Sequence, residues 1–405
     1  MMRLNLQHGS LLIALLMTTA FSRAAPLPDS SLLHQLLRTL PEEVREIIKR
    51  PQHEVQILYT QIDRPESSPV QFQEHALNVD PQRYFYPAST VKLPVALLAL
   101  EKLGALDVTD LNRDTPMLTD AVHPWQTERH EDASALSGMP SIGHDVRKIF
   151  LVSDNDSFNR LFEFVGMQHV HERLHKLRLS QTHIVHRLSV PRELDHSSYG
   201  NPIRFLDEEG SLLYRQPESF TSQSYYQGQI IQKGLGHMVN GTLVKEPKDF
   251  THNNAFPLTE QQRLLRAFIF PKSVPASQRV LLSDNNREFA LNVMSQYPRE
   301  CQDATNDALS PHEDTYATPF LAWQESPIRE SLRCYNKIGQ AYGYLVDNAY
   351  IIDRDSSVEF FLAAVIHTNA NQIFNDDVYE YDTLGKPFFK ALGETIYKYE
   401  QQRKR

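Results

Sequence analysis

The stretch from Val91 to Leu103, "VKLPVALLALEKL", constrains the fold more than any other part of this sequence. Nearly every residue in it is Val, Leu, Ala or Pro. A helix that is apolar on all sides must be buried, yet this run is shorter than the roughly 20 apolar residues that a membrane span needs. The sequence therefore predicts a central buried helix around which a large domain packs.

Lys92 is a charged residue at the start of this apolar helix. It faces the positive end of the helix dipole, and burial disfavours a charged amine, so both effects lower its pKa. Ser89 lies three residues earlier on the same helix face. A neutral lysine there could act as the base for a serine nucleophile. Alternatively, Ser89 or Thr90 caps the helix and the Lys92 amine reaches solvent.

The N-terminus has the parts of a secretory signal: an early arginine, an apolar run at residues 11–17, and small residues up to Ala24. We expect residues 1–24 to be removed and the mature chain, 25–405, to be secreted or periplasmic without a stable membrane anchor. The formal net charge of −9 becomes more negative when the signal's arginines are lost. This charge and the lack of a basic stripe exclude a nucleic-acid partner.

The mature chain is long enough for one large core with an insertion. Alternating strand patterns at 53–63 and 68–79 precede the buried helix, and helical spacing follows it at 142–166. Near the C-terminus, 342–354 and 358–369 form an aromatic, β-branched hairpin before a closing helix. This order favours an α/β domain of layered helices and sheet. We interpret about 199–332, with its scattered Pro, Gly and Asn, as an insertion subdomain.

Two further short motifs follow "S-x-x-K" in the chain. They are "SDN" at Ser153–Asn155 and "KIG" at Lys337–Gly339. Together the motifs resemble the serine β-lactamases and penicillin-binding proteins, closest to the class A pattern. The resemblance runs from about His53 to Lys398, interrupted by the insertion. It implies the β-lactamase/transpeptidase-like α/β fold, an antiparallel sheet flanked by helices plus a mostly helical domain, and an exported serine hydrolase that forms an acyl-enzyme.

The resemblance also implies a role for each motif residue. Ser89 would be the nucleophile, and Lys92 the base that takes its proton. Ser153 would pass a proton to the leaving nitrogen, while Asn155 would orient Lys92 and the substrate amide. Lys337 would supply positive charge to Ser153 and to an anionic substrate group.

The backbone N–H groups of Ser89 and Gln340, beside Gly339, would form the oxyanion hole. The family implies no cofactor and no metal. The implied substrate is a small molecule, such as a β-lactam, or a peptidoglycan-derived amide. The alternative function is that of a D,D-peptidase or an esterase of the same fold. The family usually carries Thr or Ser in the middle of the third motif to bind the penicillin carboxylate. Ile338 stands there, which weakens the expectation for β-lactams.

Class A enzymes release the acyl group with a glutamate on a loop after the S-D-N helix, and "HRLSVPRELDH" is the corresponding loop. Counting forward from Arg187 and Leu188 places Glu193 at the base position, whereas counting back from Leu194 places Pro191 there. The loop is about two residues short of the pattern, so we expect slow release of a penicillin adduct. Glu193 could instead be a solvated loop charge.

Two other functional classes compete with this interpretation. "HERLH", from His171 through Glu172 to His175, matches the H-E-x-x-H zinc motif. Arg173 would then place a cation beside the metal, and an exposed helix face is the alternative; His183, His186 and Glu193 are nearby in sequence. The second competitor is an inactive binding protein of the same fold, which would be expected to have lost the serine or the lysine.

The remaining motifs have simpler explanations. A second "SDN", Ser283–Asn285, is expected to cap the helix that follows it. Cys301 and Cys334, the chain's two cysteines, are expected to form a disulfide in an oxidising compartment; two buried thiols are the alternative. The sequence does not indicate an oligomeric state.

Overall fold

The computed structural model describes residues 25–404 except 192–195, 226–227 and 302–311. The predicted signal, 1–24, lies outside the described residues. Within the described ranges, no helix combines the length and the apolar character needed to cross a membrane.

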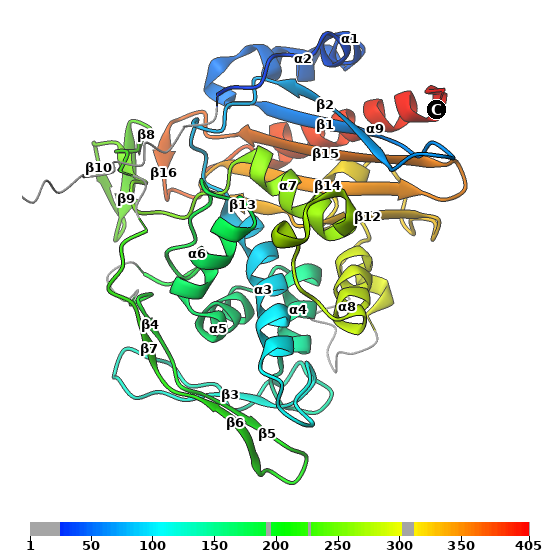
Figure 1. Ribbon diagram of the computed structural model, residues 1–405. Coiled ribbons are helices and arrows are strands. Elements are labelled where there is room, and N and C mark those ends of the chain that lie inside the picture. Colours follow the sequence, from blue (N-terminus) through cyan, green and yellow to red (C-terminus); the bar gives the residue numbers. More distant parts are fainter. Residues whose placement is uncertain (1–24, 192–195, 226–227, 302–311, 405) are drawn as a thin grey trace, which may run out of the picture.

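A central antiparallel sheet connects the two ends of the chain (Figure 1). Its strand order is β12-β14-β15-β1-β2, and β13 pairs with β14 next to β12. The predicted C-terminal hairpin is confirmed, with Tyr344 opposite His367 and Asp353 opposite Val358. The strands are β1 (Gln56–Asp63), β2 (Gln71–Leu77), β12 (Leu332–Asn336), β13 (Gly339–Ala341), β14 (Tyr344–Asp353) and β15 (Val358–His367).

Helices cover both faces of this sheet, which explains why β14 and β15 are apolar on both sides. One face packs against α1 (Ser31–Leu37), α2 (Glu42–Lys49) and α9 (Lys386–Gln402). The other face packs against α7 (Leu258–Ile269), with the rest of the helical domain beyond it (Figure 1). The predicted β-lactamase/transpeptidase-like layered architecture is therefore present.

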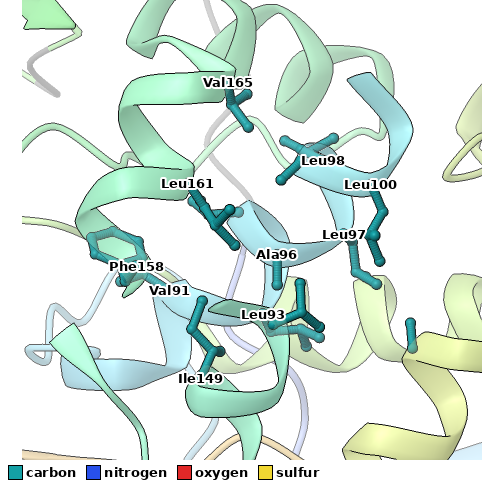
Figure 2. Close-up of a cluster of buried hydrophobic side chains, with 14 of the residues drawn as sticks. Val91, Leu93, Ala96, Leu97, Leu98, Leu100, Ile149, Phe158, Leu161 and Val165 are labelled. Atoms are coloured by element: carbon teal, nitrogen blue, oxygen red, sulfur yellow. The ribbon is translucent and has the colours of Figure 1, made fainter. Parts of the chain in front are cut away.

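Helix α3 (Lys92–Ala105) is the buried helix predicted from its composition. It packs against α4 (Ile142–Leu151), α5 (Asn155–Val165) and α6 (Met167–Lys176). Figure 2 shows apolar side chains of α3 beside those of α4 and α5, including Ile149, Phe158 and Leu161. Pro94 is tolerated because it lies in the first turn, where an N–H has no helical acceptor.

The stretch predicted as an insertion, 199–332, has two structurally different parts. Its first part is made of short strands; four of them form small sheets with β3 (Met117–Thr119) or β16 (Ile373–Phe374), and the other four pair with each other. Its second part includes α7 and α8 (Asp284–Ser295), whose apolar faces belong to the main core. The strands are β4 (Tyr199–Gly200), β5 (Ile203–Leu206), β6 (Leu212–Gln216), β7 (Ser219–Phe220), β8 (Gln232–Lys233), β9 (Gly236–Val239), β10 (Thr242–Val244) and β11 (Lys248–Asp249).

Two of the simpler expectations can be checked directly. Ser283 caps α8 as predicted, because its side chain accepts a hydrogen bond from the backbone N–H of Asn286. The expected disulfide is absent: within the described residues, Cys301 and Cys334 are not joined. The Cys334 side chain belongs to the apolar core between the sheet and α9, and burial raises the pKa of its thiol well above the usual range. This environment keeps the Cys334 thiol protonated and away from the surface.

Candidate active site

The predicted catalytic motifs, far apart in the sequence, meet where the helical domain contacts β13. Ser89 lies in the 3₁₀ helix η2 (Ala88–Val91), which leads into α3 and packs against β13 and β14. Ser153 lies in the short connection between α4 and α5. Lys337 lies between β12 and β13, so all three motifs converge at this edge of the sheet.

The Lys92 amine is at the centre of this arrangement. Its side chain is fully buried (0% exposed). In its protonated form, Nζ donates hydrogen bonds to the carbonyl of Ser153, to Ser153 Oγ at 3.1 Å and to Asn155 Oδ1 at 2.6 Å, and the neutral amine keeps two of these three bonds. Burial, and then the positive charge of Lys337, lower the pKa of Lys92 to about 6. The amine is therefore mostly neutral at pH 7, as a general base requires.

Ser89 is half-buried and lies one helical turn before Lys92. Among the described residues, the hydrogen bonds of the Lys92 amine go to Ser153 and Asn155 and none goes to Ser89. Catalytic hydrogen bonds often form only when substrate is bound. Ser89 is thus partly exposed, whereas Lys92 is fully buried.

Ser153 connects the two lysines. Its Oγ accepts a hydrogen bond from Lys92 Nζ and a second one from Lys337 Nζ, at 2.8 Å. Ser153 has a φ of +57°, a conformation that is uncommon for residues other than glycine and is enriched at active sites. Because its oxygen accepts from both amines, the hydroxyl proton of Ser153 points toward a third group.

Asp347 was not predicted from the sequence, yet it is the buried anion of the site. Its side chain is 0% exposed. Its carboxylate accepts hydrogen bonds from Asn336 Nδ2 at 2.9 and 3.0 Å and from the backbone N–H of Asn348 at 2.9 Å. Burial raises the pKa of Asp347 to about 7, and burial lowers that of Lys337 to about 7, while each charge favours the other. An acid in the middle of the apolar strand "YLVDNAYIID" was the available signal.

Strand β13 lies in close contact with the backbone that precedes Ser89. A Cβ atom on Gly339 would lie 2.5 Å from the carbonyl oxygen of Pro87 and 3.2 Å from Ala88 Cβ. Ala88 itself has a φ of +48°. Only glycine permits this approach, which brings the backbone of Gln340 close to that of Ser89. The N–H of Ser89 belongs to a first helical turn, where N–H groups lack a helical acceptor.

The loop after α6 is attached to α5 up to Ser189. Asn155 Nδ2 donates a hydrogen bond to Ser189 Oγ at 2.7 Å. Asn159 exchanges hydrogen bonds with the backbone of Leu188, at 2.8 and 3.0 Å. Arg187 forms a buried ion pair with Glu163 at 2.8 Å. Glu193, the predicted deacylation base, lies outside the described residues.

The H-E-x-x-H motif lies on α6, where His171 is buried and Glu172 and His175 are exposed. His171 is buried, its Nδ1 lies 2.9 Å from the carbonyl oxygen of Met167, and its Nε2 accepts a hydrogen bond from the backbone N–H of Ile184 at 3.4 Å. Arg173 forms a buried bidentate pair with Glu101. The expected exposed helix face therefore carries Glu172 and His175 but not His171, and a metal at His171 would have to displace one of these bonds. No metal-ligand cluster occurs in the part of the chain that the structure describes.

The family Beta-lactamase2, described as "Beta-lactamase enzyme family", matches residues 39–249. No curated protein matches the sequence. Similar solved structures include PBP-A (14% identity, 93% of this chain and 100% of that chain, TM-score 0.49). They also include a β-lactamase from Burkholderia vietnamiensis (10% identity, 89% of this chain and 96% of that chain, TM-score 0.48). Another is a β-lactamase from Sphaerobacter thermophilus DSM 20745 (12% identity, 90% of this chain and 99% of that chain, TM-score 0.47).

Proposed function

Because the chain belongs to the Beta-lactamase2 family, a family of β-lactamase-like serine hydrolases, we propose that it forms an acyl-enzyme on Ser89 with a β-lactam or a D-amino-acid peptide. The observation that carries the proposal is the buried Lys92 amine, whose pKa is lowered to about 6 and which is hydrogen-bonded to Ser153 and Asn155. A structural lysine would gain nothing from this environment, whereas a general base needs it.

In the proposed acylation step, neutral Lys92 takes the hydroxyl proton of Ser89 as Oγ attacks the substrate carbonyl. The N–H groups of Ser89 and Gln340 stabilise the resulting oxyanion. When the C–N bond breaks, Ser153 donates its proton to the leaving nitrogen and is reprotonated by Lys92. The hydrogen bonds from both lysines to Ser153 Oγ support this path, because they leave its own proton for the substrate.

The third motif favours weak recognition of the penicillin carboxylate. Lys337 can supply the charge, but Ile338 offers no hydroxyl and packs against the apolar core on the α9 side of the sheet. The proposed enzyme therefore relies on Lys337 alone at this position. This keeps a D,D-peptidase or esterase as the second candidate function.

Release of the acyl group is proposed to be slow. The loop is fixed to α5 as far as Ser189, and the sequence is about two residues short of the class A pattern before Glu193. A base that misses the catalytic water by a fraction of a hydrogen-bond length is ineffective.

Export is proposed from the N-terminal sequence alone, and the mature N-terminus of secreted protein, expected at Ala25, would test it.

Intact-protein mass spectrometry during incubation with benzylpenicillin tests the proposal. We expect a lasting adduct of one penicillin per chain on Ser89, and no adduct on a folded Ser89→Ala variant. An adduct that persists in Ser89→Ala would disprove the nucleophile. Rapid turnover without an adduct, combined with a trapped adduct in Glu193→Gln, would instead make this an efficient β-lactamase.

A further inference from the structure

Ser189 is the residue of the loop after α6 that reaches the candidate active site. Its Oγ accepts a hydrogen bond from Asn155 Nδ2 at 2.7 Å, and Oδ1 of the same amide accepts one from Lys92 Nζ at 2.6 Å. A single side-chain amide therefore separates the Ser189 hydroxyl from the amine of the proposed base.

The surrounding structure fixes the backbone of Ser189. The preceding residue, Leu188, is buried and exchanges two hydrogen bonds with the Asn159 side chain, at 2.8 and 3.0 Å. Ser189 itself has a φ of +56°, which is uncommon for residues other than glycine and is enriched at active sites. Ser153, the other serine in this hydrogen-bonded group, has nearly the same φ, +57°. The position of Ser189 is thus set by its surroundings and not by its own backbone preference.

The hydroxyl of Ser189 can interact with a bound molecule. The residue is exposed, and the bond from Asn155 uses its oxygen as an acceptor. Among the described residues, the hydroxyl hydrogen has no acceptor, so it can be donated to a water or a substrate group. An alcohol is, however, too weak a base to take a proton from water.

Release of the acyl group by water needs a base beside the ester that the substrate forms with Ser89. In this step Lys92 acts on Ser89 Oγ, which needs a proton as it leaves. Ser153 cannot accept a proton while both lysine amines donate to its Oγ, at 3.1 and 2.8 Å, because these bonds use both of its lone pairs. The amide of Asn155 is not basic. Ser189 is the next side chain in this chain of hydrogen bonds.

We propose that Ser189 occupies the position from which a base would act on the water, and that its neutral hydroxyl is the reason why the acyl-enzyme persists. The inference rests on the proposed acyl-enzyme function and names the residue that controls the second half of the reaction. It assigns this control to an earlier position in the loop than Glu193.

A carboxylate at position 189 would complete the missing step. It would take one proton from water as the water oxygen bonds to the acyl carbon. The bond between this carbon and Ser89 Oγ then breaks, and its electron pair returns to Oγ. The proton taken from water passes to Oγ by way of Lys92, so that the free serine and the released acid together contain the atoms of the ester and the water.

The test compares Ser189→Glu with Ser189→Gln, which introduce side chains of the same length and different basicity. Each variant is acylated with benzylpenicillin, the excess is removed, and loss of the adduct is followed by intact-protein mass spectrometry. We expect release at least about 10²-fold faster from Ser189→Glu than from Ser189→Gln. Equal rates of release from the two variants would overturn the inference, and so would rapid release from the wild type.

Ser189→Gly provides the test if the two longer side chains prevent folding. Glycine adopts a positive φ without strain, and the missing side chain leaves room for formate, a small carboxylate. Formate should accelerate release from Ser189→Gly in proportion to its concentration, whereas sodium chloride at the same ionic strength should not. Release from Ser189→Gly that does not respond to formate would then overturn the inference.

The adduct itself separates this inference from the proposed function. A wild type that never forms an adduct on Ser89 would reject the acyl-enzyme. Adducts that form on every variant and leave at the same rate would retain the acyl-enzyme and reject the role of Ser189.

Discussion

The catalytic seam, made of Ser89, Lys92, Ser153, Asn155 and Lys337, differs sharply from the insertion hairpin, residues 228–252. In the seam, Lys92 and Lys337 are almost completely buried, and their amines share Ser153 Oγ as an acceptor. In the hairpin the strands are two to four residues long, and several apolar side chains face solvent, among them Ile230, Leu235, Val239 and Leu243.

The difference concerns how each region is stabilised. The seam uses buried polar groups, which are costly unless every one is hydrogen-bonded, and which then hold one geometry. The hairpin has few buried apolar contacts, and regions of that kind open locally at low free energy. The proposed chemistry therefore lies in the rigid region, and the hairpin is the adaptable one.

The largest effect is expected from Lys92→Met. It removes the proposed base, so acylation by benzylpenicillin should fall by at least about 10³-fold. Lys92→Arg should fail equally, because a guanidinium does not give up its proton. Lys102→Met is the matched control: it is another lysine of α3 with a lowered pKa, about 8, but its amine donates to Gln216 and to the end of α5. This control should lose stability and keep acylation.

Lys92→Met also has a defined effect on stability. The unfolded chain protonates Lys92 up to its ordinary pKa of 10.5, whereas the folded chain does so only below about 6. Between these values the unfolded state binds the extra proton, so this lysine makes wild-type stability rise with pH, by up to about 1.4 kcal/mol per unit. The free energy of unfolding of Lys92→Met relative to wild type should therefore be highest near pH 6 and should decline toward pH 9. A difference that is flat with pH would contradict the lowered pKa.

Gly339→Ala should have the next largest effect. Its Cβ would lie 2.5 Å from the carbonyl oxygen of Pro87, so β13 must move away from η2. A displacement of this size at a reacting group commonly costs about 10²-fold in rate. The control is Gly104→Ala in α3, where no atom lies within 4 Å and alanine is the better helix former. Acylation rates and thermal melting should separate the two variants; equal rates would show that β13 does not fix the oxyanion hole.

The pH profile of acylation should respond to Asp347. The rate should rise through about pH 6 as Lys92 loses its proton and fall above about pH 7 as Lys337 loses its charge. Asp347 favours the charged form of Lys337, so Asp347→Asn should move the falling limb to lower pH. Rates across pH 5–9 provide the measurement. A uniform decrease without a shift of this limb would make Asp347 a structural residue only.

Much of this fold could be predicted from local patterns. The apolar helix before Leu103, the strand alternation at 53–63 and the C-terminal hairpin all depend on neighbours in the sequence. The motif serines and lysines could be found because their spacing is diagnostic of a family. What could not be found depends on packing between distant segments: Asp347 meets Asn336 only through the register of β12 with β14, and Cys334 is kept from a disulfide by the core around it.

The smallest effect is expected where the hairpin is attached to the main domain. Lys233 Nζ on β8 lies 2.6 Å from Glu54 Oε2, which also accepts a hydrogen bond from the Tyr344 hydroxyl at 3.1 Å. Both charged side chains are mostly buried, so Glu54→Gln should destabilise this attachment by about 1 kcal/mol.

Hydrogen exchange would locate that loss. The amides of 232–249 should exchange several-fold faster in Glu54→Gln, while those of β14 and β15 keep the protection of the global fold. Glu394→Gln, which breaks an exposed pair with Lys398 on α9, should change neither region. If the central strands and the hairpin lost protection together, the two regions would open as one unit, and the contrast between a rigid seam and an adaptable hairpin would have to be abandoned.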